Sequence, residues 1–129
     1  MNAKSLRWLK FAKDDFEVGQ ATLISFGDRY AGIVAYHAQQ AAEKAFKAFL
    51  VFNDKFVPKT HNLNVLLDQC DALDSDFKNI WIQADRLNPF SIQTRYPDDI
   101  CTELTREEAE ELLRCSEQII ELVEKKIKS

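Results

Sequence analysis

The stretch "YHAQQAAEKAFKAFL", residues 36–50, decides the fold that the sequence predicts. It lies within a longer segment, residues 29–52, whose small and apolar side chains recur with helical spacing. At about 100° per residue these side chains fall in one arc of about 120°: Val34, Ala38, Ala41, Ala42, Ala45, Ala48, Phe49 and Phe52. Alanines in such a stripe let a neighbouring backbone approach closely, as in tightly packed bundles. The segment therefore predicts a long helix packed closely against its neighbours.

A second amphipathic segment, residues 5–26, comes before it. Its apolar and small residues alternate between spacings of three and four, which predicts a helix with one buried stripe: Leu9, Ala12, Phe16, Gly19, Leu23 and Phe26. We expect Ser5 to be the N-cap of this helix. We expect Gly27 and Asp28 to end it, because glycine readily adopts the left-handed conformation past a helix end.

Three further helices are predicted after the break "NDKFVPKT", residues 53–60. A short third helix, with Thr60 as its expected N-cap, carries Leu63, Leu66, Leu67 and Cys70. A fourth ends near Asn88 and Pro89, since proline disfavours helical geometry in the residue before it, and carries Phe77, Ile80, Trp81, Ala84 and Leu87. The last begins at a capping box of Thr105 and Glu108 and carries Ala109, Leu112, Leu113, Ser116, Ile119, Ile120, Val123 and Ile127.

The predicted fold is all-α: an up-and-down four-helix bundle with one additional short helix. No window alternates convincingly between apolar and polar residues, and no internal repeat is found. A chain of 129 residues has room for one core, so residues 1–129 are expected to form a single domain.

The composition, 46% hydrophobic and 29% charged, is that of an ordinary globular protein. The three cysteines, Cys70, Cys101 and Cys115, form no CxxC pair, which favours a reducing compartment over a disulfide framework. No apolar stretch resembles a secretory signal or approaches the roughly 20 residues that span a bilayer. We therefore expect a soluble, cytoplasmic protein with no membrane contact.

The net charge of −4 is unevenly distributed. Residues 1–97 carry 12 basic and 11 acidic residues, a balance of +1, whereas residues 98–129 carry 5 and 10, a balance of −5. Binding of duplex DNA usually requires a basic face, so it is not expected here.

Polar residues that could bind a ligand lie on the second predicted helix. His37, Gln40 and Lys44 fall within about 60° of arc and could donate hydrogen bonds or charge to a phosphate or a base. Alternatively, they form a solvated helix face. His61 follows Thr60, where it could simply stabilise the turn. Neither histidine has HxxxH or HExxH spacing, so no metal site is predicted, and no cofactor is expected.

The segment "NPFSIQTRYPDD", residues 88–99, breaks the helical pattern. Arg95 offers a planar guanidinium to a phosphate or carboxylate, and Tyr96 offers a ring and a hydroxyl. Asp98 and Asp99 could accept hydrogen bonds from a ligand or from Arg95. Two interpretations remain open from residue types alone: a ligand site, or an Arg–Asp contact that fastens the loop to the bundle.

Taken together, residues 36–50, "KTHNLNVLL" (59–67) and "LNPFSIQTRYPDD" (87–99) resemble the HEPN domain. The similarity is to small stand-alone HEPN proteins of bacteria and archaea and covers roughly residues 6–127. It implies a five-helix domain with an up-and-down core that is commonly a homodimer. It also implies a frequent partnership with a minimal nucleotidyltransferase, in pairs often described as toxin–antitoxin systems, and a nucleotide-binding role.

The residues that match the family blocks are the candidates for a nucleotide site: His37, Gln40, Lys44, His61, Arg95, Tyr96 and Asp98. Many HEPN proteins are metal-independent ribonucleases with an Arg four to six residues before a His. Here Gly32 stands five residues before His37, and Phe56 five before His61. The expectation is therefore a non-catalytic module that binds a nucleotide or a nucleotidyltransferase partner.

Two alternatives remain. One is a ribonuclease in which Arg29 or Arg95 acts with His37, although Arg29 precedes His37 by eight residues. The other is a purely structural dimeric adaptor, since nine Phe and two Trp exceed what one thin core is expected to bury.

Overall fold

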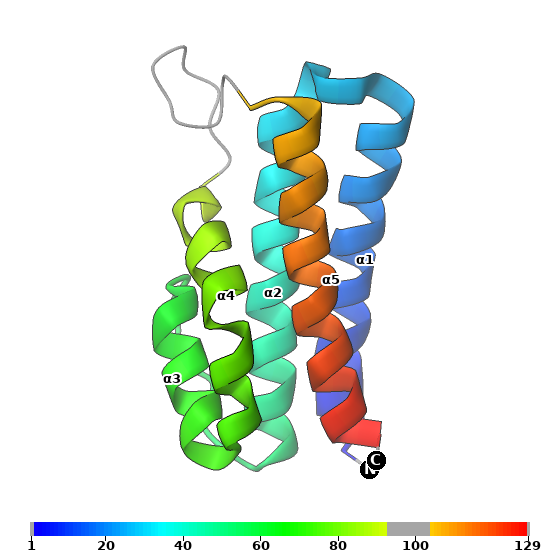
Figure 1. The fold of residues 1–129 in the computed structure, drawn as a ribbon. Coiled ribbons are helices and arrows are strands. Elements are labelled where there is room, and N and C mark those ends of the chain that lie inside the picture. Colours follow the sequence, from blue (N-terminus) through cyan, green and yellow to red (C-terminus); the bar gives the residue numbers. More distant parts are fainter. Residues whose placement is uncertain (1, 93–103, 129) are drawn as a thin grey trace.

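The computed structural model describes residues 2–92 and 104–128 and contains no strand in those residues. The helices are α1 (Ala3–Phe26), α2 (Ala31–Phe52), α3 (Leu63–Leu73), α4 (Trp81–Leu87) and α5 (Arg106–Lys128), with 3-10 turns η1 (Gly27–Tyr30), η2 (Ser75–Ile80) and η3 (Asn88–Phe90). Helices α1, α2, α4 and α5 alternate in direction, and α3 lies beside α4 (Figure 1). The predicted all-α, up-and-down bundle with one additional short helix is confirmed. No helix in the described ranges is long and apolar enough to cross a bilayer.

Helix α2 is the centre of the bundle. It packs against α1, α5, α3 and α4, so neighbours lie on most of its sides (Figure 1). The predicted single stripe of about 120° is therefore too narrow. Its buried residues extend beyond that stripe: Ala31, Val34, Ala35, Ala38, Gln39, Ala41, Ala42, Glu43, Ala45, Phe46, Lys47, Ala48, Phe49 and Leu50.

The alanines of residues 36–50 have the role expected of them. Ala38, Ala41, Ala42, Ala45 and Ala48 are all 0% exposed. A similar close approach occurs at Gly19 of α1, where an added Cβ would lie 3.1 Å from Leu113 Cδ2 and 3.5 Å from His37 Cβ. Small residues thus set the spacing among α1, α2 and α5.

The first helix begins earlier than predicted. Asn2, not Ser5, is the N-cap of α1: its Oδ1 accepts hydrogen bonds from the backbone N–H groups of Lys4 (2.9 Å) and Ser5 (3.3 Å). Ser5 lies inside the helix, buried, and donates its hydroxyl to the Asn2 carbonyl. At the other end Gly27 ends the helix as expected, with a positive φ of 59°; its ψ of −138° is outside the left-handed helical conformation that was expected, in a region that also favours glycine. The 3-10 turn that follows moves the start of α2 from residue 29 to Ala31.

The cap of α3 also differs from the prediction. Asn62 accepts from the N–H groups of Asn64 (2.9 Å) and Val65 (3.4 Å). Thr60 stabilises the turn before the helix, because its Oγ1 accepts a hydrogen bond from the backbone N–H of Asn62 at 3.1 Å. Asparagine and threonine are both good caps, and spacing alone did not separate them.

The predicted fourth helix is a composite of η2, α4 and η3, and it ends near Asn88 and Pro89 as expected. The capping box of α5 is confirmed. Thr105 Oγ1 accepts from the N–H of Glu108 at 3.1 Å, and Glu108 Oε1 accepts from the N–H of Thr105 at 3.0 Å.

Replacing Ala45 by Leu tests the close packing of α2. Ala45 is fully buried, so the added methyl groups must displace neighbouring helices. We expect a loss of about 1–3 kcal/mol in the free energy of unfolding, measured by urea denaturation. Ala72→Leu, at an exposed position of α3, is the control and should change stability little. Equal effects of the two substitutions would contradict this account of the packing.

Candidate functional site

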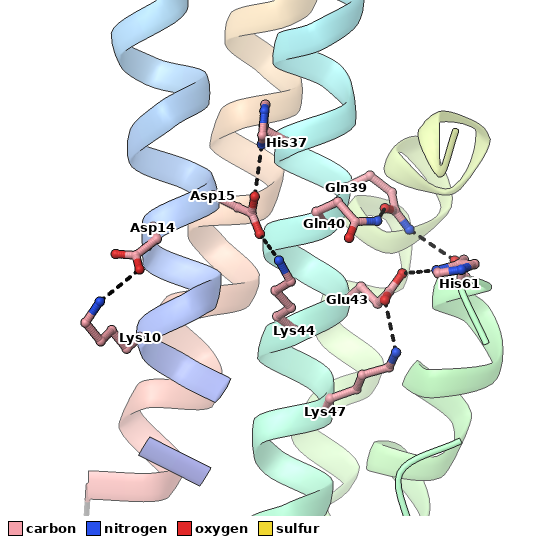
Figure 2. Close-up of polar contacts among 10 residues, drawn as sticks. All are labelled: Lys10, Asp14, Asp15, His37, Gln39, Gln40, Glu43, Lys44, Lys47 and His61. Atoms are coloured by element: carbon pink, nitrogen blue, oxygen red, sulfur yellow. Dashed lines mark hydrogen bonds and ion pairs between the residues drawn. The ribbon is translucent and has the colours of Figure 1, made fainter. Parts of the chain in front are cut away.

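Two clusters of polar side chains lie along α2, one facing α1 and the other facing α3 (Figure 2). The first is centred on Asp15 of α1. His37 Nδ1 lies 2.9 Å from Asp15 Oδ1, and Lys44 Nζ lies 2.5 Å from Asp15 Oδ2. One carboxylate therefore holds two candidate ligand residues that stand about two turns apart on α2.

The charge of Asp15 is stabilised by these two partners. Burial would raise the pKa of this carboxyl group, but hydrogen bonds from His37 and Lys44 and the charge of both outweigh it, so the pKa lies below its ordinary value. Asp15 is thus an anion that neutralises Lys44. A phosphate approaching His37 and Lys44 would meet a carboxylate already in place between them.

The second cluster is more deeply buried. Glu43 and Lys47, one turn apart on α2, are only 4% and 7% exposed, and Lys47 Nζ lies 3.0 Å from Glu43 Oε2. Lys47 Nζ also lies 5.8 Å from the centre of the Trp8 ring, a cation–π contact with α1. The other carboxylate oxygen, Glu43 Oε1, lies 2.9 Å from His61 Nδ1. Each buried charge therefore has a partner, as its desolvation requires.

Two glutamines extend this cluster. Gln39, fully buried, donates from Nε2 to the His61 carbonyl at 3.0 Å. Gln40 donates from Nε2 to Gln39 Oε1 at 2.8 Å. Backbone and side chain of His61 are thus both held by α2 (Figure 2).

Asn88 connects the start of α3 to the end of α4. Its Oδ1 accepts from the N–H of Leu63 at 2.9 Å, and its Nδ2 donates to Asn62 Oδ1 at 3.3 Å. Hydrogen bonds join the three sequence blocks that resemble the HEPN domain. Glu43 of residues 36–50 bonds to His61 of residues 59–67, and Asn88, which follows Leu87, bonds to Asn62 and Leu63.

The chemical consequence lies at His61. An ionised carboxylate only accepts hydrogen bonds, so His61 Nδ1 carries the proton shared with Glu43. This leaves Nε2 of a side chain that is 70% exposed to accept a proton or, when the ring is charged, to donate to an anion. A fixed imidazole orientation is the arrangement expected of a binding or proton-transfer group.

Four of the predicted site residues lie in the described part of the chain, and they are divided between the two clusters. His37 and Lys44 belong to the cluster of Asp15, whereas Gln40 and His61 belong to that of Glu43. Arg95, Tyr96 and Asp98 lie outside the described residues.

The sequence analysis missed Asp15, Gln39, Glu43 and Lys47. A signal was present for one pair: Glu43 and Lys47 stand four apart in the sequence of one predicted helix, the spacing of an ion pair between successive turns. Asp15 had no such signal, because its partners lie on another helix.

The proposed pairing of Arg29 with His37 finds no support in the geometry. The Arg29 guanidinium lies over the Tyr30 ring, 5.2 Å from its centre, while the His37 ring meets Asp15 and Tyr36. Cysteine chemistry is also disfavoured at Cys70, because burial raises the pKa of its thiol far above the ordinary value.

A profile of the HEPN domain matches residues 5–126, nearly the whole chain. The chain belongs to the HEPN family. The family resemblance drawn from the three sequence blocks is thereby confirmed.

Two solved structures share the fold of this chain, and one sequence relative is similar to most of its length. TT1696 from Thermus thermophilus is 33% identical, with a TM-score of 0.79 over 98% of this chain and 99% of its own. ST0689, described as an archaeal HEPN homologue, shares the fold with a TM-score of 0.76 and 23% identity over 95% and 97% of the two chains. A Methanocaldococcus jannaschii protein named "Putative toxin MJ1304" is 29% identical over 90% of this chain and 83% of its own.

Asp15→Asn tests the first cluster of this HEPN protein. The amide cannot carry the charge that holds His37 and Lys44, so we expect a loss of about 1–3 kcal/mol near neutral pH. Because the pKa of Asp15 is lowered on folding, its contribution is present above the unfolded pKa of about 4 and disappears as pH falls through the lower folded value. The difference in Tm between wild type and variant should shrink from pH 5 to pH 3.

The matched control is Asp14→Asn, one residue away. Asp14 is 49% exposed and pairs with Lys10, itself 70% exposed, so its loss should change stability by less than about 1 kcal/mol. Asp14 and Asp15 variants that behave alike at every pH would contradict the role assigned to Asp15.

Proposed function

We propose that this chain is a toxin-like HEPN protein that binds a nucleotide at His61. The observation that carries the proposal is a histidine whose Nδ1 is held by buried Glu43 while its side chain stays 70% exposed. The third family block lies nearby, since Asn88 bonds to Asn62 and Leu63, the two residues that follow His61. Its similarity to a protein named "Putative toxin MJ1304" supports the toxin-like assignment.

The surroundings of His61 suit a phosphorylated ligand. Helix α3 begins at Leu63, two residues after His61, so the positive end of its dipole lies close to His61 along the chain. The first three N–H groups of the helix already donate to Asn88 and Asn62, so the imidazole is the group left to meet a phosphate. A protonated His61 donates from Nε2 to a phosphate oxygen, and a neutral one accepts from a ribose hydroxyl. In this proposal Arg95, Tyr96 and Asp98, which follow Asn88 in the sequence, complete the site.

A nucleotidyltransferase partner and a homodimer belong to the same proposal. Several large apolar side chains support such contacts by remaining exposed: Ile24 (71%), Phe26 (52%), Phe56 (85%), Ile82 (55%) and Ile92 (69%). Sedimentation of the pure protein tests the dimer, and a monomer at micromolar concentration contradicts it. Co-expression with a minimal nucleotidyltransferase encoded beside it tests the partner. Failure of the two to co-purify contradicts that part.

The nucleotide site is tested by thermal shift with ATP, GTP and their diphosphates. A ligand at 100 times its Kd stabilises the protein by about 2.7 kcal/mol, which is a rise in Tm of several degrees for a chain of this size. We expect His61→Ala to lose this rise and still fold, since Lys47 continues to neutralise Glu43.

Two control variants locate the site. Lys59→Ala, at an exposed position close in sequence, should keep the full rise. His37→Ala should keep it too, because His37 belongs to the cluster of Asp15. A rise that survives in His61→Ala and is lost in His37→Ala would move the site to the other cluster. No rise with any nucleotide would contradict the proposal altogether.

A further inference from the structure

The first half of α1 carries a basic and aromatic face that the proposed nucleotide site does not use. Residues 1–13 contain four basic residues, Lys4, Arg7, Lys10 and Lys13, and no acidic one. Lys4, Arg7, Trp8 and Phe11 follow the spacing i, i+3, i+4 and i+7, which places them on one side of a helix. We call these four residues the α1 face.

The α1 face is hollowed. Its four residues line a pocket of about 280 Å³. Phe11 is 44% exposed, and Trp8 is half-buried, packed against the core. On the inner side of the same helix, Ser5, Leu9 and Ala12 are buried. The bundle therefore holds α1 fixed, with a charged and aromatic surface turned outward.

Each of the two rings has one cation near its face. Lys10 Nζ lies 5.9 Å from the centre of the Phe11 ring, and Lys47 Nζ lies 5.8 Å from that of Trp8. Lys10 also pairs with Asp14, and Lys13 pairs with Glu124. By contrast, the side chains of Lys4 and Arg7 form no ion pair with any residue in the described ranges 2–92 and 104–128, so their charge is available to a ligand.

We propose that the α1 face binds single-stranded nucleic acid. Unpaired bases stack on aromatic rings whatever their sequence, while lysine and arginine follow the phosphates. From Lys4 to Phe11 the face extends about 10 Å along the helix, long enough for a short run of nucleotides. Stacking on Phe11, with Lys4 and Arg7 beside the backbone, uses every exposed group of the face.

The alternatives fit less well. A bilayer requires a helix with a broad apolar side, whereas the α1 face sets exposed Phe11 between the cations Lys4, Arg7 and Lys10, and its neighbours Leu9 and Ala12 are buried in the core. Duplex DNA keeps its bases stacked and requires a longer basic footprint, whereas Asp14 and Asp15 follow directly after Lys13. A purely apolar protein partner would leave Lys4 and Arg7 unpaired.

Fluorescence anisotropy with labelled 12-nucleotide oligo(U) and oligo(dT), and a duplex of the same length, tests the inference. We expect the single strands to bind more tightly than the duplex. Phe11→Ala should weaken binding roughly tenfold, the loss of one stacked base. Arg7→Ala should weaken it and also reduce the slope of log K against log salt by about 0.7, the value for one phosphate contact on a single strand.

Matched controls come from α4 and η2, which lie on the other side of α2 from α1 (Figure 1). Trp81→Ala removes an aromatic ring that is 55% exposed, and Lys78→Ala removes an exposed cation. Neither should change the affinity. The nucleotide proposal is tested with mononucleotides and His61→Ala, and this inference with oligonucleotides and variants of the α1 face, so the two can fail separately. Circular dichroism checks that each variant is folded.

Several outcomes would overturn the inference. These are no binding of either single strand, equal losses in the α1 and control variants, or a preference for the duplex. A Phe11→Ala variant that changes the oligomeric state but not the affinity would make the α1 face a contact between copies of the chain. Arg7-dependent binding to vesicles of anionic lipid, without binding to oligonucleotides, would make it a membrane contact.

Discussion

The structure depends on one constraint: α2 is enclosed on most sides, so each polar group on its buried surface needs a partner inside the protein. Glu43 and Lys47 meet this need through each other, and Gln39 and Glu43 meet it through His61. Because those bonds reach across to the segment that precedes α3, they also fix where α3 begins. The burial of one helix thereby positions the exposed imidazole.

The same constraint explains why the two histidines differ in exposure and in the partners of their carboxylates. His37 is 23% exposed and meets a carboxylate that also holds Lys44, which makes it part of the contact between α1 and α2. His61 meets a carboxylate already neutralised by Lys47 and keeps its outer nitrogen towards solvent. The stripe of His37, Gln40 and Lys44 on one helix thus divides between two clusters, and only the cluster of Glu43 includes a largely exposed histidine.

The sequence predicted the helices well because their small and apolar residues repeat with helical spacing, and the capping box of Thr105 and Glu108 is a local pattern. It predicted the caps at Ser5 and Thr60 wrongly, because Asn2 and Asn62 offer equally good side chains a few residues away. The partners of the site residues were the hardest part. Asp15 meets His37 across 22 positions of sequence, and Glu43 meets His61 across 18, distances at which helical periodicity carries no information.

The central claim is that buried Glu43 fixes the tautomer of His61, and NMR of the imidazole nitrogens tests it most directly. In the neutral ring the account predicts a proton on Nδ1 and none on Nε2, the reverse of the state usually favoured by a free histidine in water. Glu43→Gln should relax this preference, since an amide can donate as well as accept. A wild-type His61 that carries its proton on Nε2, unchanged by Glu43→Gln, would contradict the account.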